Sequence, residues 1–328
     1  MDAKERVGTA LSFYAPIQYE LKQVEDGLKG VVHTGMGSTD ALVSHVVDVQ
    51  GKRVRSAITL LAAKMLGCHD EGPVLMGTAV ELLHLATLLH DDTVDNADVR
   101  RGRATLSSLE GAETAVLVGD FLFAASAVKV CDTQNIRVIR RFSETIMDLS
   151  SGQLTERYMV NNWQQTRDQY MERIYKKTGS LFATSSESGA VLSGADETTI
   201  QLMRSFGKNL GTAFQVVDDI LDFEGTAAEI GKPVGNDLAS GTLTLPALLL
   251  VERYPENNPV VALCQGIDRE ENIKRAVDMM HNTGIIYDAY AVAEELRLQA
   301  NASLDAMPDS EYKQALLELS DFVLARHV

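Results

Sequence analysis

The stretch Glu81–Arg103, ELLHLATLLHDDTVDNADVRRGR, carries the strongest pattern in the chain. Its first half is apolar at almost every position over a helical length, and a helix of that kind belongs in a protein core. Its second half is acidic and then basic. Asp91 and Asp95 are four residues apart, so on a helix they share one face, with His84 two turns earlier on the same side. Like charges at this spacing repel, and a divalent cation offsets that repulsion most directly.

The residues after the aspartates suggest what such a cation would hold. Mg²⁺ usually binds through one or two carboxylates together with substrate phosphates. Arg100, Arg101 and Arg103 follow closely, and arginine recognises phosphate bidentately. We interpret the stretch as a metal–diphosphate site. A helix that ends in a solvated, salt-bridged loop explains one such cluster equally well.

A second apolar stretch, Gly211–Phe223 (GTAFQVVDDILDF), repeats the pattern. Asp218 and Asp222 are again four residues apart, Asp219 lies between them, and Gln215 is one turn earlier. Carboxylates on two core helices are very costly without cations, because unpaired buried charge is strongly unfavourable. If the two helices face each other, they frame a cavity with acid at its mouth and apolar walls. Such a cavity suits an amphiphile with a diphosphate head and a hydrocarbon tail.

The composition of the whole chain narrows the function further. The chain has 328 residues and a net charge of -16, which argues against nucleic acid as a partner and favours solubility. Its three cysteines, Cys68, Cys131 and Cys264, lack the spacing of a metal knuckle and indicate a reducing compartment. The N-terminus has charges where a signal peptide needs an apolar core, and we identify no apolar run of membrane-spanning length. We therefore expect a cytoplasmic protein without a transmembrane segment.

Helix signals dominate and strand alternation is scarce, so we expect an all-α protein with one domain over residues 1–328. Pro73 suits the first turn of the central helix, and Thr166 with Gln169 resembles a capping box. The other helices are expected at 1–29, 40–48, 56–66, 113–130, 134–160 and 196–223, followed by an irregular loop at 225–241 and helix as far as 326.

Two basic clusters accompany the aspartates. Gly51–Arg55, GKRVR, places three cations at a helix start, where a solvated basic turn is the commoner outcome. Lys176–Gly179, KKTG, lies inside a helical pattern and indicates little by itself.

Together these motifs resemble those of the trans-isoprenyl diphosphate synthases, the polyprenyl synthetase family. The resemblance runs from about Gly51 to Pro246 and is closest to the long-chain polyprenyl branch. In chain order the matching motifs are GKRVR at 51–55, DDxxD with RRG at 91–102, KTG at 177–179, and FQVVDDILD at 214–222 with GKPVGND at 231–237. The resemblance implies one large helical bundle of the isoprenoid (terpene) synthase type with a central cavity.

The resemblance also implies an activity. The enzyme would join isopentenyl diphosphate head to tail to an allylic diphosphate (dimethylallyl, geranyl, farnesyl or geranylgeranyl). Mg²⁺, three ions per site in the family, would stabilise charge on the leaving diphosphate. Asp91 and Asp95 would hold two ions and Asp218 the third. The released diphosphate would take the proton, because no side-chain base is evident.

The family's remaining site residues are carried over by position. Asp92, Asp219 and Asp222 complete the aspartate motifs, and for Asp92 and Asp222 a supporting or solvated carboxylate is as good an interpretation as direct ligation. For His84 a hydrogen-bonded core histidine is the alternative. The other expected residues are Arg100, Lys177 and Lys232 on the allylic diphosphate, Lys52, Arg55, His84 and Arg101 around isopentenyl diphosphate, and the carbonyl of Thr178 and the amide of Gln215 facing the developing cation.

The sequence departs from the family pattern at a few positions. Ser56 stands where proline is frequent, Ala104 follows RRG in place of proline, Gln50 replaces a second glycine, and Thr242 replaces a lysine. These differences leave the shape of the loops and one diphosphate contact open, but the metal ligands are intact.

Product length is indicated by Ala86 and Thr87, five and four residues before Asp91. In the family the product grows along this helix, and an aromatic residue there acts as a floor. Both residues are small here, so we expect the tunnel to continue towards Glu113–Val130, where Ala124–Ala127 again lack bulk. We expect a product longer than about twenty carbons, because each isoprene unit buries apolar surface worth roughly 0.8 kcal/mol per CH₂, and the resemblance to the family implies about thirty to fifty carbons.

Three alternatives remain. A short-chain farnesyl or geranylgeranyl diphosphate synthase would share every motif. A class I terpene cyclase would share the fold and one DDxxD, but it handles a single diphosphate and needs no second basic pocket. A non-catalytic subunit of a heteromeric synthase would be expected to lose its acidic motifs.

The resemblance also implies a homodimer.

Overall fold

The computed structural model describes residues 12–33, 35, 37–48, 51–100, 102–224 and 234–325. Contacts divide the chain into two compact units, which are described one at a time. Unit 1 comprises Met1–Ser143, Thr184–Arg204 and Ala306–Glu318, and unit 2 comprises Glu144–Ala183, Ser205–Asp305 and Leu319–Val328. The single domain over 1–328 stays a prediction, and residues 1–11 of the expected N-terminal helix lie outside the described residues.

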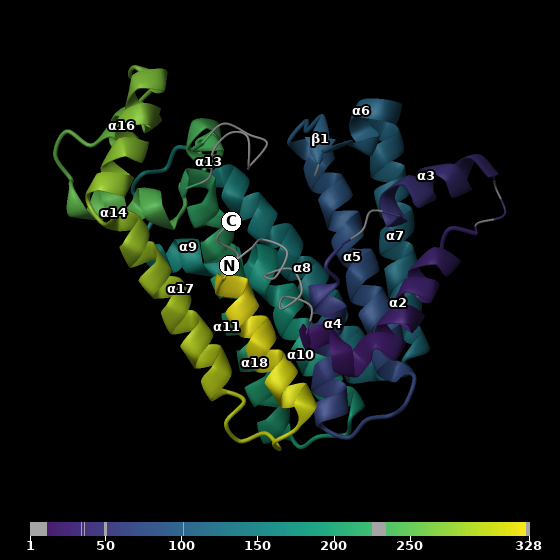
Figure 1. The fold of residues 1–328 in the computed structure, drawn as a ribbon. Coiled ribbons are helices and arrows are strands. Elements are labelled where there is room, and N and C mark those ends of the chain that lie inside the picture. Colours follow the sequence, from purple (N-terminus) through teal and green to yellow (C-terminus); the bar gives the residue numbers. More distant parts are fainter. Residues whose placement is uncertain are drawn as a thin grey trace. The chain divides into compact units, whose positions relative to one another are not determined.

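Unit 1 is built from helices and one very short hairpin (Figure 1). Its elements are η1 (Ser12–Ile17), α2 (Gln18–Gly30), α3 (Gly37–Val47), α4 (Val54–Met65), α5 (Gly72–Val94), β1 (Val99–Arg100), β2 (Arg103–Ala104), α6 (Leu106–Glu110) and α7 (Ala112–Asp132). The helices α8 (Ile136–Tyr158), α10 (Ser180–Leu192), α11 (Glu197–Glu224) and α18 (Glu311–Leu324) contribute residues to both units.

The core helix of unit 1 is α5, as its apolar sequence predicts. Pro73 lies in its first turn, where a missing backbone N–H costs nothing. The helix packs against α7, α4 and α2, and Leu82, Leu83 and Ala86 are completely buried. Burial of a large apolar side chain contributes roughly 1.5–3 kcal/mol, so this packing holds the motif at the C-terminal end of α5 on a stable base.

Close helix packing also holds the start of α4. A Cβ on Gly77 of α5 would lie 3.3 Å from the Cβ of Ser56, and a Cβ on Gly189 of α10 would lie 2.6 Å from the carbonyl oxygen of Thr59. Glycine is therefore needed at Gly189 for the two backbones to approach. The consequence is that the first turns of α4, which follow the GKRVR cluster, are held from two sides.

The expectation that no apolar run reaches membrane-spanning length is wrong for two helices. By length and composition, α5 and α7 could each cross a membrane, and other helices in the described part of the chain do not reach that limit. For α5 the explanation is core packing, since about two thirds of its apolar window is buried in the protein. Only about one third of the corresponding stretch of α7 is buried, so much of the apolar surface of α7 is exposed among the residues that the structure describes.

The described residues of unit 2 form helices joined by turns and loops, with no strand among them (Figure 1). Besides its parts of the shared helices it contains α9 (Arg167–Ile174), η2 (Tyr175–Gly179), α13 (Asn236–Ser240), α14 (Leu245–Arg253), α15 (Pro259–Cys264), α16 (Arg269–Asn282) and α17 (Ile285–Ala302). The predicted capping box is present: the Thr166 hydroxyl accepts from the N–H of Gln169, whose side chain accepts from the N–H of Thr166.

The core of unit 2 is organised around the C-terminal half of α11. Val216, Val217, Ile220 and Phe223 are completely buried among apolar residues of α14 and α17. These four positions alternate with Asp218, Asp219 and Asp222 of the second motif along the same helix. The spacing of three and four residues therefore separates a core face from an acidic face.

The expected helices agree with the structure within a few residues at most ends. Two differences concern residues near the motifs. The expected irregular loop at 225–241 contains the helix α13, while residues 225–233 lie outside the described part. The second difference is η2, a turn of π-helix at the KTG motif, which interrupts what the sequence suggests is regular α-helix.

Candidate active site

The first carboxylate motif lies at the C-terminal end of α5. The helix ends at Val94, but the N–H of Asp95 donates to the carbonyl of Asp91 over 2.8 Å. Helical geometry therefore continues to Asp95, and the two side chains lie on one side as predicted. Asp91 is half-buried and Asp95 is exposed, so solvent and ligands reach this side of the helix end.

The middle aspartate of this motif has a different environment. Asp92 is only 5% exposed, and its Oδ1 lies 2.6 Å from Nε of Arg100 on β1. The β1–β2 hairpin thus returns the first predicted phosphate-binding arginine to the motif that precedes it. The supporting role considered for Asp92 agrees with this pairing. Arg101 lies outside the described residues.

The GKRVR cluster is held in shape by two acids that the sequence did not single out. Arg53 adopts a left-handed backbone conformation with φ 48°, and its Nε lies 2.6 Å from Glu25 Oε1. Its Nη1 lies 3.7 Å from the buried Glu81 of α5. The only available signal was the charge at position 81 within an apolar run, which is unusual for a core helix.

Ser56 explains why proline is not needed after this cluster. Both its backbone N–H and its hydroxyl group donate to Glu81 Oε1 over 3.1 Å. Proline would lack the first of these donors. Arg53 and Ser56 together tie the start of α4 to α5, and Lys52 and Arg55 flank the tied residues.

The three described residues of the expected isopentenyl diphosphate pocket all lie in unit 1. Lys52 is exposed in the turn before α4, and its carbonyl accepts from the Tyr14 hydroxyl. Arg55 and His84 are half-buried, in the first turn of α4 and on α5. Because α4 packs against α5, these residues come from neighbouring helices, and their assignment to a substrate stays a prediction.

In unit 2 the second motif forms a hydrogen-bond chain. Asp219 is 4% exposed and accepts from the Tyr170 hydroxyl over 2.8 Å and from Nε2 of Gln215 over 2.7 Å. The hydroxyl of Thr178 donates to Oε1 of Gln215 over 2.6 Å. The chain Tyr170–Asp219–Gln215–Thr178 therefore joins α9, α11 and η2, and it fixes which way the Gln215 amide faces. Tyr170 is a site residue that sequence reasoning missed.

Burial dominates the electrostatics of Asp219. Burial, followed by the charge of Asp237, raises the pKa of Asp219 to about 8, although hydrogen bonds from Gln215 and Tyr170 act in the opposite direction. A divalent cation at the neighbouring Asp218 would favour the ionised carboxylate. The protonation of Asp219 is thus coupled to whatever charge binds beside it.

The π-turn η2 presents the KTG motif to α8 and α11. A Cβ on Gly152 of α8 would lie 2.7 Å from the backbone nitrogen of Lys177, and a Cβ on Gly179 would lie 3.0 Å from Oγ1 of Thr212. The turn is therefore packed closely on both sides. Lys177 forms an ion pair with Glu156 of α8. Single π-turns are frequent at functional sites.

Asp222 closes the segment that follows the second motif. Its Oδ2 accepts from the N–H of Asp237 over 3.0 Å, and its carbonyl accepts from the N–H of Gly235 over 2.8 Å. These bonds return the chain to α11 at the start of α13. Lys232 lies outside the described residues. The supporting role considered for Asp222 is consistent with these contacts.

The donor set fits magnesium better than a metal bound by protein alone. No group of three His, Cys, Asp or Glu side chains within the described ranges is placed to hold a metal ion. Each motif instead offers a pair of carboxylates on one helix face. Mg²⁺ is usually bound by one or two carboxylates plus substrate phosphates, so each pair matches the protein's share of such a site.

The two residues expected to affect product length lie on α5, as the sequence predicts. Ala86 is completely buried, and Thr87 is half-buried with its hydroxyl donating to the carbonyl of His84 over 2.8 Å. The expected continuation on α7 is divided, because Ser126 is buried whereas Ala124 and Ala127 are exposed. Only part of the small-residue run on α7 therefore faces the interior of unit 1.

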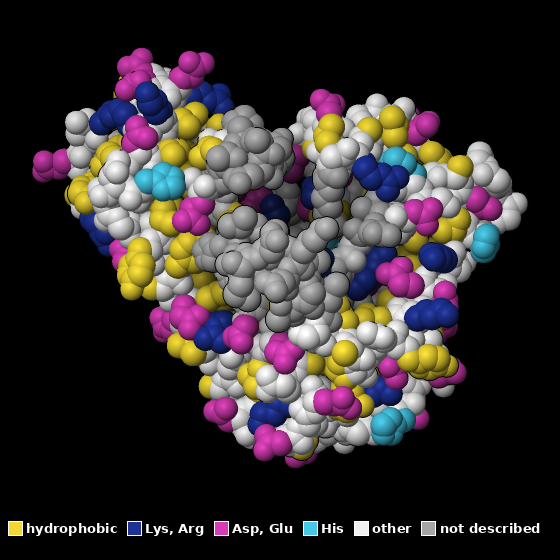
Figure 2. Space-filling view, in the orientation of Figure 1, with side chains coloured by type: hydrophobic (Ala, Val, Ile, Leu, Met, Phe, Trp, Pro, Cys, Tyr) yellow, Lys and Arg dark blue, Asp and Glu magenta, His cyan; other side chains and the backbone are white. Residues whose placement is uncertain are grey.

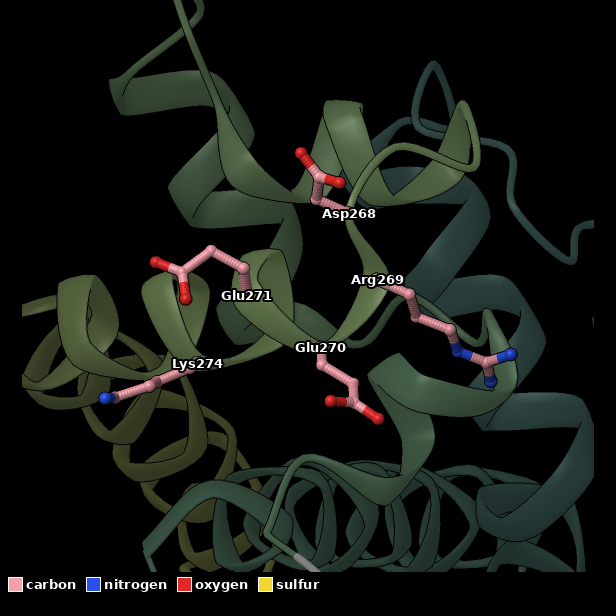
Figure 3. Close-up of a pocket in the computed structure, with 5 residues that line it drawn as sticks. All are labelled: Asp268, Arg269, Glu270, Glu271 and Lys274. Atoms are coloured by element: carbon pink, nitrogen blue, oxygen red, sulfur yellow. The ribbon is translucent and has the colours of Figure 1, made fainter.

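A hollow at the start of α16 does not resemble a second site. It is lined by Asp268, Arg269, Glu270, Glu271 and Lys274. Their side chains point in different directions rather than towards a common point (Figure 3). Acidic and basic side chains are mixed over this end of unit 2 (Figure 2), so the surface favours neither an anionic nor a cationic ligand.

Comparison with known proteins identifies the family. The sequence model of the family described as Polyprenyl synthetase matches residues 38–286. A protein of Synechocystis named prenyl transferase is 36% identical over 324 residues, which cover 96% of this chain and 98% of that protein. The chain belongs to the polyprenyl synthetase family, and the predicted family and prenyltransferase class are confirmed.

Solved structures confirm the fold class. A decaprenyl diphosphate synthase from Rhodobacter capsulatus aligns with TM-score 0.90 and 31% identity over 96% of this chain and 98% of that one. A polyprenyl synthase from Caulobacter crescentus, complexed with calcium and isoprenyl diphosphate, aligns with TM-score 0.91 and 30% identity over 97% and 98%. The all-α isoprenoid synthase fold predicted from the sequence is therefore confirmed.

The hydrogen-bond chain leads to a prediction for Tyr170. Tyr170→Phe keeps the buried ring but removes the donor to Asp219, which a cation at Asp218 would keep ionised, and a hydrogen bond to a charged group is worth roughly 1.5–3 kcal/mol. We expect prenyl-transfer kcat/KM to fall at least about tenfold, measured by steady-state assay. Tyr287→Phe, at an exposed tyrosine of unit 2, is the control and should have no effect. Equal activity of the two variants would contradict the role of this chain.

Proposed function

We propose that the protein condenses isopentenyl diphosphate head to tail with an allylic diphosphate and produces an all-trans polyprenyl diphosphate in a Mg²⁺-dependent reaction. The observation that carries the proposal is the repeated pair of carboxylates, Asp91 with Asp95 on α5 and Asp218 with Asp222 on α11. The chain belongs to a prenyltransferase family, and each of its two aspartate motifs offers carboxylate oxygens as ligands for a metal ion.

The charged residues divide into two substrate sites in this proposal. Arg100, which is attached to Asp92, binds the allylic diphosphate together with Lys177 and Lys232. Lys52, Arg55, His84 and Arg101 bind isopentenyl diphosphate. When bound by Asp91, Asp95 and Asp218, Mg²⁺ supplies Lewis-acid stabilisation of the leaving diphosphate. The calcium and isoprenyl diphosphate in the Caulobacter structure support a divalent cation together with a diphosphate.

Thr178 and Gln215 act on the hydrocarbon part of the allylic substrate rather than on its diphosphate. Loss of diphosphate leaves an allylic cation, which the double bond of isopentenyl diphosphate attacks before a proton is released. The carbonyl of Thr178 and the amide of Gln215 direct dipoles at this positive charge. Their orientation is held by the hydrogen bond between the Thr178 hydroxyl and Gln215 and by the bond from Gln215 to Asp219.

Product analysis separates this proposal from its alternatives. The purified protein is incubated with labelled isopentenyl diphosphate, each allylic primer and Mg²⁺, and the products are separated by chromatography. Labelled all-trans polyprenyl diphosphates support the proposal. A cyclic hydrocarbon released from an allylic diphosphate alone indicates a terpene cyclase, and no product without a second protein indicates a subunit of a heteromeric synthase. A cytoplasmic location stays a prediction.

The aspartates provide the first test of mechanism. Asp91→Ala or Asp218→Ala removes a ligand for the cation that stabilises the leaving group, and loss of one major electrostatic contact lowers turnover roughly 10²–10³-fold. We expect such losses in kcat with both variants. The exposed Asp309 is the control, since Asp309→Ala leaves both motifs intact. Near-normal turnover of Asp91→Ala and Asp218→Ala would exclude the metal assignment.

We also propose a long-chain product. The support is the buried Ala86 on α5 and the name of the related decaprenyl diphosphate synthase. An open apolar path favours continued elongation, because each buried CH₂ contributes roughly 0.8 kcal/mol. We therefore propose all-trans products of about thirty to fifty carbons, in preference to the short-chain farnesyl or geranylgeranyl products.

Ala86→Tyr tests the path directly. A tyrosine adds a bulky ring at this buried position of α5, five residues before Asp91. The ring should block further growth of the product, so products should shorten to about twenty carbons or fewer. The first condensation should be largely intact, as measured by chromatography of products from a dimethylallyl primer. Unchanged long products would show that Ala86 does not line the path. A wild-type product of twenty carbons or fewer would exclude the open path itself.

We further propose a homodimer formed through α7. Leu117 and Val128 are 62% and 59% exposed on this helix, and they lie eleven residues apart, which is about three turns, so both are on one face. An isolated apolar face of this kind is typical of an interface. A stable interface buries about 1,200–2,000 Å² in total, which a helix of this length can anchor in a symmetric pair.

Sedimentation velocity at micromolar protein tests the dimer. We expect twice the mass of one chain for the wild type. Leu117→Asp places a charge in the apolar face and should shift the protein towards the monomer, whereas Tyr287→Asp, at an exposed residue of α17, should not. A wild-type protein that sediments as a monomer would rule out this assembly.

A further inference from the structure

His90 lies on α5 immediately before Asp91, and its imidazole reaches across to α7. Its Nε2 is 3.2 Å from the carbonyl oxygen of Val116 and 3.7 Å from Oδ1 of Asp120. The ring centroid is 5.3 Å from that of Phe123. One side chain on α5 therefore touches three successive turns of α7. The function proposed above leaves this contact unused.

Gly119 of α7 leaves the space, called its seat below, that the ring of His90 occupies. A Cβ on Gly119 would lie 2.1 Å from Nε2 of His90 and 2.4 Å from its Cδ2. Cβ atoms do not approach other atoms this closely, so an alanine here would force the imidazole out. The helix α7 is thus notched at the one residue opposite His90. Since glycine weakens a helix interior, the notch has a cost that the seated ring offsets.

The contact also fixes the hydrogen on the ring. A backbone carbonyl only accepts hydrogen bonds, so Nε2 of His90 carries the hydrogen and donates it to Val116. The carboxylate of Asp120 lies near the same nitrogen and favours the same arrangement. The imidazole is therefore held by a directed bond, and its orientation about α5 is defined.

The end of α5 needs such a tether. Carboxylates at a helix C-terminus interact unfavourably with the helix dipole, and Asp91, Asp92 and Asp95 all lie in or beside the last turn. That turn contains no basic residue, and Asp95 and its neighbours Val94 and Asn96 are exposed. Like charges four residues apart add repulsion. Arg100 pairs with Asp92, and the contact of His90 with α7 adds a second lateral restraint on the last turn of α5.

We propose that His90 is a positioning residue for the first carboxylate motif. Seated in the notch at Gly119 and bonded to Val116, it fixes the rotation of the last turn of α5, and with it the direction of the Asp91 and Asp95 carboxylates. This inference rests on the proposed role of these carboxylates in holding the cation. His90 touches neither substrate nor cation, and it acts through the helix that carries the ligands.

Four variants test the proposal in the full-length protein. His90→Ala removes the ring, and Gly119→Ala fills its seat while favouring the helix. The double variant combines them, and His90→Gln keeps an N–H donor that can reach Val116. Gly30→Ala is the control, because a Cβ on this helical glycine meets no atom within 4 Å.

Steady-state kinetics should show a specific pattern. We expect each single alanine variant to raise the Mg²⁺ concentration for half-maximal rate and the KM for the allylic primer roughly tenfold, with the KM for isopentenyl diphosphate little changed. The double variant should be no worse than the worse single variant, because both changes remove one interaction. His90→Gln should recover part of the loss. Additive losses, or equal changes in both KM values, would overturn the proposal.

A second readout needs no turnover. A ligand that binds only the folded protein raises its Tm, so Mg²⁺ with inorganic diphosphate should raise the Tm of the wild type and of Gly30→Ala. The increase, measured against the Tm of each protein without ligand, should be smaller for His90→Ala and Gly119→Ala. Equal increases in all proteins would refute the positioning role. Gly119→Ala keeps this test valid if His90→Ala does not fold.

The two proposals fail in different ways. An inactive wild type in the product assay contradicts the proposed function, whatever the variants do. An active wild type whose Mg²⁺ dependence is unaffected by His90→Ala and Gly119→Ala leaves the function in place and contradicts only the role of His90.

Discussion

Burying a carboxylate among apolar helices is costly unless donors surround it, and this constraint shapes both units. Glu81 receives two hydrogen bonds from Ser56 and faces the guanidinium of Arg53. Asp219 receives bonds from a tyrosine and a glutamine. Glu187 lies 3.6–3.7 Å from three arginine side chains. These buried acids are thus points at which helices are tied to one another.

The two aspartate motifs satisfy the same constraint in different ways. The partner of Asp92 is Arg100, eight residues later on a local hairpin. The partner of Asp219 is Tyr170, 49 residues earlier on another helix. The first motif, at the end of a helix, is consequently held by residues nearby in the sequence. The second, within a helix, is held by contacts with other helices. The first depends on how α5 ends, and the second depends on how α9 and η2 pack on α11.

This difference explains how much could be predicted from the sequence. The apolar run with Pro73 predicts α5, and the Thr166–Gln169 pair predicts the start of α9, because both signals are local. The aspartate spacings predict their helix faces for the same reason. The contact of Tyr170 with Asp219 could not be predicted, since nothing in the sequence of α9 indicates its partner. Likewise, Gly119 reads as an ordinary weak point in α7 until the ring of His90 is placed against it.

The π-turn η2 determines which side of the residues that follow it faces α11. Tyr170, Thr178 and Phe182 all contact α11, at Asp219, at Gln215 and at Phe214. In an unbroken α-helix eight residues rotate by about 800°, which would leave Thr178 roughly 80° away from the face of Tyr170. A turn with i→i+5 bonding rotates less per residue and absorbs most of that difference. The π-turn therefore corrects the rotation of the chain, and an α-helical turn in its place would turn Thr178 and Phe182 away from their partners on the helix that carries the second motif.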